Sequence, residues 1–165
     1  MKSLKPPKSL PQLSCLEKAV DLLSRRSHSR SELATKLRRR GYELAAIEVT
    51  LSKLVDLSYL DDAKFASAKA RDAAKIKRHG PLRIRQDLRQ RGVASNLIDQ
   101  AIAEAYEKTP ALEVAKKSAE RQMNRLKKLD KAVARRRMAG MLQRRGFDGE
   151  TVRRVVGDLL GKFDE

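Results

Sequence analysis

Apolar residues recur along the chain in a pattern that repeats three times. Each copy has an Arg-Gly pair, ending at Gly41, Gly92 or Gly146, and these glycines lie about 50 residues apart. Apolar residues stand eight and four positions before each glycine and one, six and ten positions after it. Those offsets predict two amphipathic helices joined at the glycine. The matching residues are Leu33, Leu37, Tyr42, Ile47 and Leu51, then Ile84, Leu88, Val93, Ile98 and Ile102, then Met138, Leu142, Phe147, Val152 and Val156.

A further helix precedes each pair. Its apolar stripe is marked by Ala19 and Leu22 in the first copy, by Phe65 and Ala66 in the second and by Val114 in the third. No proline falls inside a predicted helix, which supports an all-helical fold. We therefore predict an all-α protein of three tandem three-helix repeats, with helices over residues 14–25, 29–40, 43–57, 61–78, 81–91, 95–108, 110–128, 130–145 and 148–162.

The pattern divides the chain into a tail and three repeats. Residues 1–13 hold three of the five prolines and predict a disordered basic tail. The repeats are expected over residues 14–60, 61–109 and 110–165. A repeat this small has little interior and becomes stable by docking on its neighbours, so we expect an elongated array whose curvature stays open.

Polar residues mark where the helices begin and end. Ser29 and Glu32 have the spacing of a capping box. Further caps are expected at Asp61 or Asp62, Ser95, Asp130 and Asp148. The three repeat glycines stand where a left-handed residue ends the middle helix of each repeat, and none belongs to a glycine-rich phosphate loop.

The net charge indicates the class of partner more clearly than the rest of the composition does. Lys plus Arg is 38 against 21 for Asp plus Glu, which gives a net charge of +17 and favours a polyanionic partner. Aromatic residues are only 4 %, and most stand at packing positions, so base stacking is not supported. Helix-turn-helix contact with duplex DNA stays open, because each repeat ends in two helices around a turn.

The sequence offers little material for catalysis, cofactors or metals. Cys15 is the only cysteine and has no histidine nearby in sequence, so we interpret it as a small helix residue rather than a nucleophile. His28 and His79 are expected to be solvent-exposed loop residues. The Asp61–Asp62 pair fits a helix N-terminus, with a contact to a partner's basic side chain as the alternative. We expect no enzyme activity, no cofactor and no metal.

The apolar runs are too short for a membrane span. The longest comprise four residues, such as 44–47, against about 20 for a spanning helix. Prolines interrupt the basic N-terminal residues, so no secretory signal is expected. We expect a cytoplasmic protein, and a monomer because no heptad seam marks a dimer surface.

Basic residues recur on the middle helix of every repeat. One cluster alone is typical of a solvated helix face, whereas recurrence in three copies favours a binding surface. If the repeats stack in register, these residues form one basic track. Its candidate filament- or DNA-binding residues are Lys36, Arg38, Arg39, Arg40, Arg83, Arg85, Arg89, Arg91, Arg135, Arg136, Arg137, Arg144 and Arg145.

The repeat, the turn and the acidic doublet together resemble the RecX family of bacterial recombination regulators. The most specific segment is Tyr59-Leu60-Asp61-Asp62 followed by Phe65-Ala66, and the likeness covers about residues 15–160. Ser58 stands where the family usually has glycine. The other quoted matches are Ala19 to Leu23, Arg30 to Leu33, Leu37, Gly41, Leu54, Arg71, Gly80, Ile84, Leu88, Arg91 to Val93, Ile98, Ala101 and Arg144 to Phe147. Within these, we expect structural roles for Tyr59, Leu60, Asp61, Asp62, Phe65, Arg71, Gly41, Gly92 and Gly146.

The resemblance implies a non-enzymatic modulator. RecX-like proteins bind the RecA recombinase filament on single-stranded DNA and usually inhibit its ATP hydrolysis, strand exchange and co-protease activity. The alternative is a general DNA-binding or DNA-architectural protein without a recombinase partner. It predicts tight binding to naked DNA and no selective effect on filaments.

Overall fold

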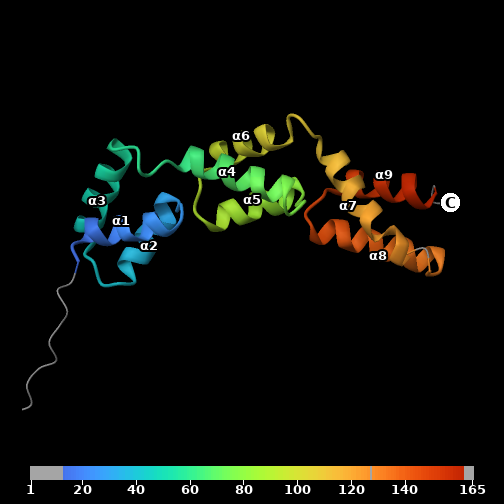
Figure 1. Cartoon of the computed structure of the whole chain (residues 1–165), viewed down its shortest axis with the longest axis horizontal. Coiled ribbons are helices and arrows are strands. Elements are labelled where there is room, and N and C mark those ends of the chain that lie inside the picture. The colour runs from blue at the N-terminus through green and yellow to red at the C-terminus, as the bar shows by residue number, and fades with distance from the viewer. Residues whose placement is uncertain (1–12, 127, 162–165) are drawn as a thin grey trace, which may run out of the picture. The chain divides into compact units, whose positions relative to one another are not determined.

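The computed structural model describes residues 13–126 and 128–161, so the predicted tail falls almost wholly outside the described residues. Within those ranges the chain forms α-helices and no strand (Figure 1). The all-α prediction is confirmed, and each predicted helix is present with its ends shifted by at most a few residues. The helices are α1 (Cys15–Arg25), α2 (Arg30–Arg38), α3 (Leu44–Asp56), α4 (Asp62–Lys75), α5 (Pro81–Gln90), α6 (Ser95–Tyr106), α7 (Ala111–Leu126), α8 (Lys131–Arg144) and α9 (Gly149–Leu160).

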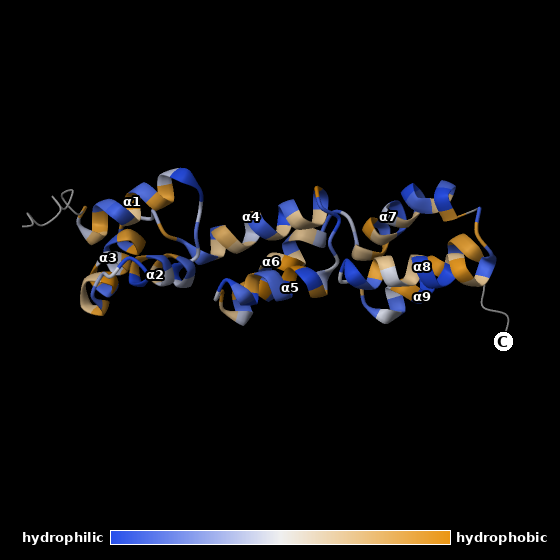
Figure 2. Cartoon of the chain, turned by 90° about the horizontal axis from the view of Figure 1, so that it is seen from below, coloured by the Kyte–Doolittle hydropathy of each residue, from blue (hydrophilic) through white to orange (hydrophobic). Residues whose placement is uncertain are grey.

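The helices group into two compact units. The first unit runs to Asp61 and contains the first repeat, α1–α3. The second unit starts at Asp62 and contains the second repeat, α4–α6, and the third repeat, α7–α9. Each repeat has its own cluster of buried apolar residues. The helices carry hydrophobic residues on one side and hydrophilic residues on the other, as Figure 2 shows.

The recurring apolar positions form these cores. Leu33, Ile84 and Met138 stand eight residues before their glycines and are at most 1 % exposed. The positions four before and six and ten after are also buried in every repeat. Burial of a Leu or Ile side chain is worth about 1.5–3 kcal/mol, so these positions supply much of the stability of a small repeat. The prediction from periodicity is confirmed at these four offsets; at the position after the glycine, Val93 and Phe147 are buried and Tyr42 is partly buried.

Most predicted caps are present. Ser29 Oγ accepts the backbone N–H of Glu32 at 3.1 Å, and Asp130 and Asp148 accept backbone N–H groups of α8 and α9. The cap expected at Ser95 is wrong, because Ala94 is the N-cap and Ser95 is already helical. Sequence reasoning missed Ser14, which forms a reciprocal capping box with Glu17 at the start of α1.

A left-handed glycine follows each middle helix within three residues of its end. The φ angles are +86° at Gly41, +72° at Gly92 and +86° at Gly146. In each repeat the residue after the glycine donates its N–H to the carbonyl of the leucine four residues before the glycine. The predicted turn is therefore confirmed, and it sets the direction in which the third helix leaves the second.

The second and third repeats are joined through backbone contacts. Gly80 N–H donates to the carbonyl of Arg145 at 2.7 Å, and Leu82 N–H donates to the carbonyl of Gly146 at 3.0 Å. These bonds place the end of α8 at the start of α5. Tyr106 packs against the cores of both repeats. Its hydroxyl donates to the carbonyl of His79, and burial raises the pKa of that phenol.

The exposure expected for the histidines is wrong. His28 is only 3 % exposed, and His79 is partly buried with a buried Nδ1 atom. The ring of His28 contacts Lys36 Nζ of α2. A Ser- and Arg-rich sequence around a turn gives no signal of that tertiary contact.

None of the described helices is both long enough and apolar enough to cross a membrane.

Candidate nucleic-acid and protein interface

Three arginines project from the C-terminal end of α2. Arg38 is the last helical residue, Arg39 is the C-cap, and Arg38, Arg39 and Arg40 are all exposed. Arg40 Nη1 donates to the carbonyl of Lys36 at 2.9 Å. Positive charge is favourable at this end of a helix because the helix dipole is negative there. Arg38 and Arg39 form no ion pair within the described residues, so their guanidinium groups are available for an anionic partner.

Lys36 differs from these arginines, because its side chain turns back toward the protein. Lys36 Nζ lies 2.9 Å from His28 Nε2, and His28 Nδ1 lies 2.9 Å from the carbonyl of Arg26. The carbonyl only accepts and the ammonium only donates, so the neutral ring carries its proton on Nδ1. Burial, followed by the charge of Arg26, lowers the pKa of Lys36, and the same two causes lower the pKa of His28.

The basic residues of α5 are partly neutralised. Arg83 pairs with Asp87 at 3.4 Å, and Arg85 pairs with Asp99 of α6. Arg89 is exposed and forms no ion pair among the described residues. Arg91 is the C-cap of α5, is partly buried and has a partner. Arg89 is therefore the residue of this helix most available to an anion.

The basic residues of α8 divide in the same way. Arg135 donates to the carbonyl of Gly161 at 2.7 Å and so binds the end of α9. Arg145 donates to the carbonyl of Lys77 at 3.0 Å and contacts that of Arg78 at 3.4 Å. These two side chains therefore form contacts within the protein. Among the predicted residues of this helix, Arg136, Arg137 and Arg144 are exposed and form no ion pair among the described residues.

The motif residues occupy mixed environments. Leu60 and Phe65 are each 3 % exposed and lie in the cores of the first and second repeats. Asp62 opens α4, where its carboxylate opposes the positive end of the helix dipole, and Asp61 precedes it. Tyr59, by contrast, is 70 % exposed and lines a shallow hollow with Val20 and Leu23. Arg71 is exposed on α4.

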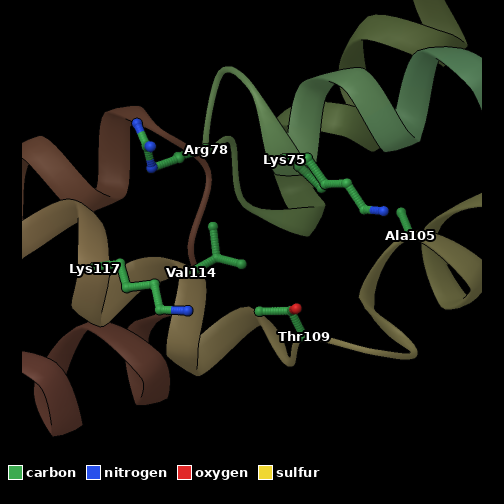
Figure 3. Close-up of a pocket in the computed structure, with 7 residues that line it drawn as sticks. Lys75, Arg78, Ala105, Thr109, Val114 and Lys117 are labelled. Atoms are coloured by element: carbon green, nitrogen blue, oxygen red, sulfur yellow. The ribbon is translucent and has the colours of Figure 1, made fainter.

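A second group of cations lies outside the predicted track. A hollow of about 240 Å³ lies where the second and third repeats meet, and it is lined by Lys75 at the end of α4, by Arg78 after α4 and by Lys117 of α7. Figure 3 shows Lys75 and Lys117 on opposite sides of Val114 and Thr109. Lys75, Arg78 and Lys117 lie on or beside the first helices of the second and third repeats, α4 and α7. In the sequence this group is marked by the basic cluster of Lys75, Lys77 and Arg78 and by the spacing of Lys117 and Arg121, one helical turn apart.

Family models match all three repeats. The model of the first three-helix domain of RecX matches residues 15–54, that of the second matches residues 61–102, and that of the third matches residues 111–156. A protein named Regulatory protein RecX from Vibrio campbellii is 39 % identical over 142 residues, which cover 86 % of this chain and 89 % of the relative. Another of that name, from Chlorobaculum tepidum, is 33 % identical over 149 residues, which cover 90 % of each chain.

Solved structures agree with these matches. The crystal structure of RecX from Lactobacillus salivarius superposes with a TM-score of 0.78 at 22 % identity and covers 88 % of this chain and 94 % of that one. A crystal structure titled regulatory protein RecX superposes with a TM-score of 0.76 at 26 % identity and covers 87 % and 70 %. Three domain matches in the order of the repeats, together with relatives that align over most of their length, show that this chain belongs to the RecX family of regulatory proteins.

Proposed function

We propose that this protein binds the filament that the RecA recombinase forms on single-stranded DNA, and that it lowers the filament's ATP hydrolysis, strand exchange and co-protease activity. It acts by binding and not by chemistry of its own. The observation that carries the proposal is membership of a family of regulatory proteins combined with exposed, unpaired arginines on the middle helices. Arg38, Arg39, Arg136 and Arg137 are the residues expected to make first contact.

The physical argument starts from what these side chains can do. A guanidinium group donates two parallel hydrogen bonds to a carboxylate or a phosphate, so the same arginine serves an acidic protein surface or a DNA backbone. Charges at the edge of an interface mainly raise the association rate and make it sensitive to salt. A regulator with a net charge of +17 therefore approaches an anionic filament quickly.

The test is the rate of ATP hydrolysis by RecA filaments preassembled on single-stranded DNA, with this protein titrated in at near-physiological salt. We expect a fall in rate at well under one protein per recombinase subunit. A charge-matched basic peptide should have no such effect. If the protein leaves the rate unchanged, the proposal is wrong.

A pair of triple variants locates the contact. Arg38→Glu, Arg39→Glu and Arg40→Glu together should raise the protein concentration needed for half-maximal effect about tenfold or more. The matched control reverses three exposed charges outside the middle helices, Lys53, Arg153 and Arg154, and should change it less than about threefold. Equal effects of the two triples would mean that net charge matters and the α2 arginines do not.

A second candidate function is general DNA binding, which the net charge favours. It predicts tight, salt-dependent binding to bare DNA. Strong binding to bare DNA, combined with no effect on filament ATP hydrolysis in the same buffer, would select it.

A further inference from the structure

The hollow between the second and third repeats is part of a longer depression. Next to it lies a hollow that shares Lys75 and Thr109 and adds Arg71. On its other side lies one that shares Arg78 and Lys117 and adds Arg121. We call the three together the junction groove. All of its lining residues belong to the second compact unit, so its geometry does not depend on the first repeat.

Positive charge dominates the junction groove. Its six cations are faced by three carboxylates, those of Glu104, Glu107 and Glu120. Glu104 already accepts from Ser67 Oγ at 2.8 Å and from Gln100 Nε2 at 3.0 Å. No ion pair within the described residues involves the cations, which are Arg71, Lys75, Arg78, Lys108, Lys117 and Arg121.

The apolar side chains on the floor of the groove are small and almost fully buried. Ala74 is 2 % exposed, Val114 is 8 % exposed and Ala105 is 9 % exposed. A protein partner usually gains its affinity from large apolar or aromatic anchors buried in pockets, and here little area remains to bury. The groove would therefore bind a partner mainly through its positive charge. A polymer with regularly spaced negative charges gains the most from such a surface.

We propose that the junction groove binds the phosphodiester backbone of a nucleic-acid strand. Arg71 and Lys75 stand one turn apart on α4, and Lys117 and Arg121 stand one turn apart on α7, so each wall repeats its cation about every 6 Å. None of the described residues that line the groove is aromatic. Binding through phosphates alone holds a strand without reading its sequence.

The walls are held in place before any ligand arrives. Arg145 binds the carbonyls of Lys77 and Arg78, and the Tyr106 hydroxyl binds the carbonyl of His79. Arg78 itself has a left-handed φ of +52°. A cation on a fixed backbone loses less entropy on binding than one on a mobile loop. The proposal stands whether or not a recombinase is the partner, because its probe is DNA alone.

The experiment measures binding of a fluorescein-labelled 20-mer of thymidylate by anisotropy, over a series of salt concentrations. The groove variant is the full-length protein with Lys75→Gln, Lys117→Gln and Arg121→Gln. Its control carries Lys53→Gln, Lys116→Gln and Arg125→Gln, which removes the same charge from exposed sites, two of them on the same α7 helix. Melting curves followed by circular dichroism check that both variants keep the fold.

We expect the groove variant to bind the 20-mer about tenfold more weakly than the control variant. Its slope of log K against log salt should be less steep by about 2, since each phosphate contact on a single strand contributes about 0.7. Equal weakening in both variants would overturn the proposal in favour of a diffuse positive field. Unchanged DNA binding with loss of binding to a polyglutamate 20-mer would overturn it in favour of an acidic peptide.

Discussion

Gly80 and Gly146 meet backbone to backbone where the second repeat joins the third. A Cβ atom on Gly80 would overlap the carbonyl of Gly146, and a Cβ atom on Gly146 would overlap the backbone of Arg83. The α5 helix has no side-chain cap, and the carbonyl of Gly146 accepts the N–H of Leu82 in its first turn at 3.0 Å. The turn that follows α8 therefore caps the start of α5, the middle helix of the preceding repeat.

Gly80→Ala should destabilise the second unit by about 1–3 kcal/mol, because the new methyl group meets backbone atoms that cannot move alone. The matched control is Gly157→Ala, which lies inside α9 with no atom within 4 Å of the new methyl group. That change should stabilise the helix by about 0.5–1 kcal/mol. Urea unfolding followed by circular dichroism checks both, and a neutral Gly80→Ala would contradict the packing.

Gly146→Ala should cost more than Gly41→Ala, although both glycines have a φ of +86°. At Gly41 a methyl group meets nothing within 4 Å, so only the left-handed backbone is penalised, by about 1–2 kcal/mol. At Gly146 the clash with Arg83 adds to that penalty. Hydrogen exchange of α5 amides gives a second readout, and we expect faster exchange only in Gly146→Ala.

Ser58→Gly should stabilise the first unit. Ser58 adopts a left-handed φ of +59°, and its N–H donates to the carbonyl of Val55 at 2.8 Å. Glycine removes a backbone strain of about 1–2 kcal/mol and adds unfolded-state entropy worth about 0.4–1 kcal/mol. The net gain expected is thus about 0.5 kcal/mol. Ser52→Gly, inside α3, should instead lower stability, and a loss of stability in Ser58→Gly would refute the strain argument.

Variants of Arg145 and Arg144 should distinguish a residue that stabilises the fold from one that binds DNA. Arg145→Gln loses charge-assisted bonds to two carbonyls, each worth about 1.5–3 kcal/mol, and should lower the stability of the second unit. Arg144→Gln removes an exposed charge without a bonded partner and should leave stability unchanged while weakening DNA binding. Melting temperature and DNA anisotropy measured on both variants check this. A loss of stability in Arg144→Gln with none in Arg145→Gln would contradict the prediction.

Stability should fall as the pH drops below about 6.5. Burial lowers the pKa of both His28 and His79 in the folded protein. The unfolded chain then binds more protons in the window below 6.5, so stability is full above that pH and declines through the folded-state pKa values. Protonated His28 would also lose its acceptor for Lys36 and meet a second positive charge.

Melting temperatures between pH 5.5 and 7.5 at constant ionic strength test this dependence. The double variant His28→Gln and His79→Gln should show a clearly flatter profile than the parent. If both profiles fall equally, groups other than the two histidines are responsible.

Much of the fold could be predicted because the apolar pattern is local. Leu33, Leu37 and Ile47 are buried where helical periodicity expects them, since a helix face depends only on positions three and four residues apart. The left-handed glycines could be predicted for the same reason, because the sequence shows each of them after the end of a periodic segment. Ser95 was misplaced by one residue because propensity alone does not locate a cap.

Only the tertiary structure decided which basic residues are exposed and which bind other parts of the protein. Arg38 and Arg135 look alike in the sequence, yet Arg38 is exposed while Arg135 binds the carbonyl of Gly161, 26 residues away. Lys36 turns to His28, and Arg145 crosses to the second repeat. Charge is a property of one residue, whereas the partner of that charge is chosen by contacts between distant segments. By itself the sequence determined the helices, the repeats and the positive charge, and long-range packing decided which cations remain available to bind.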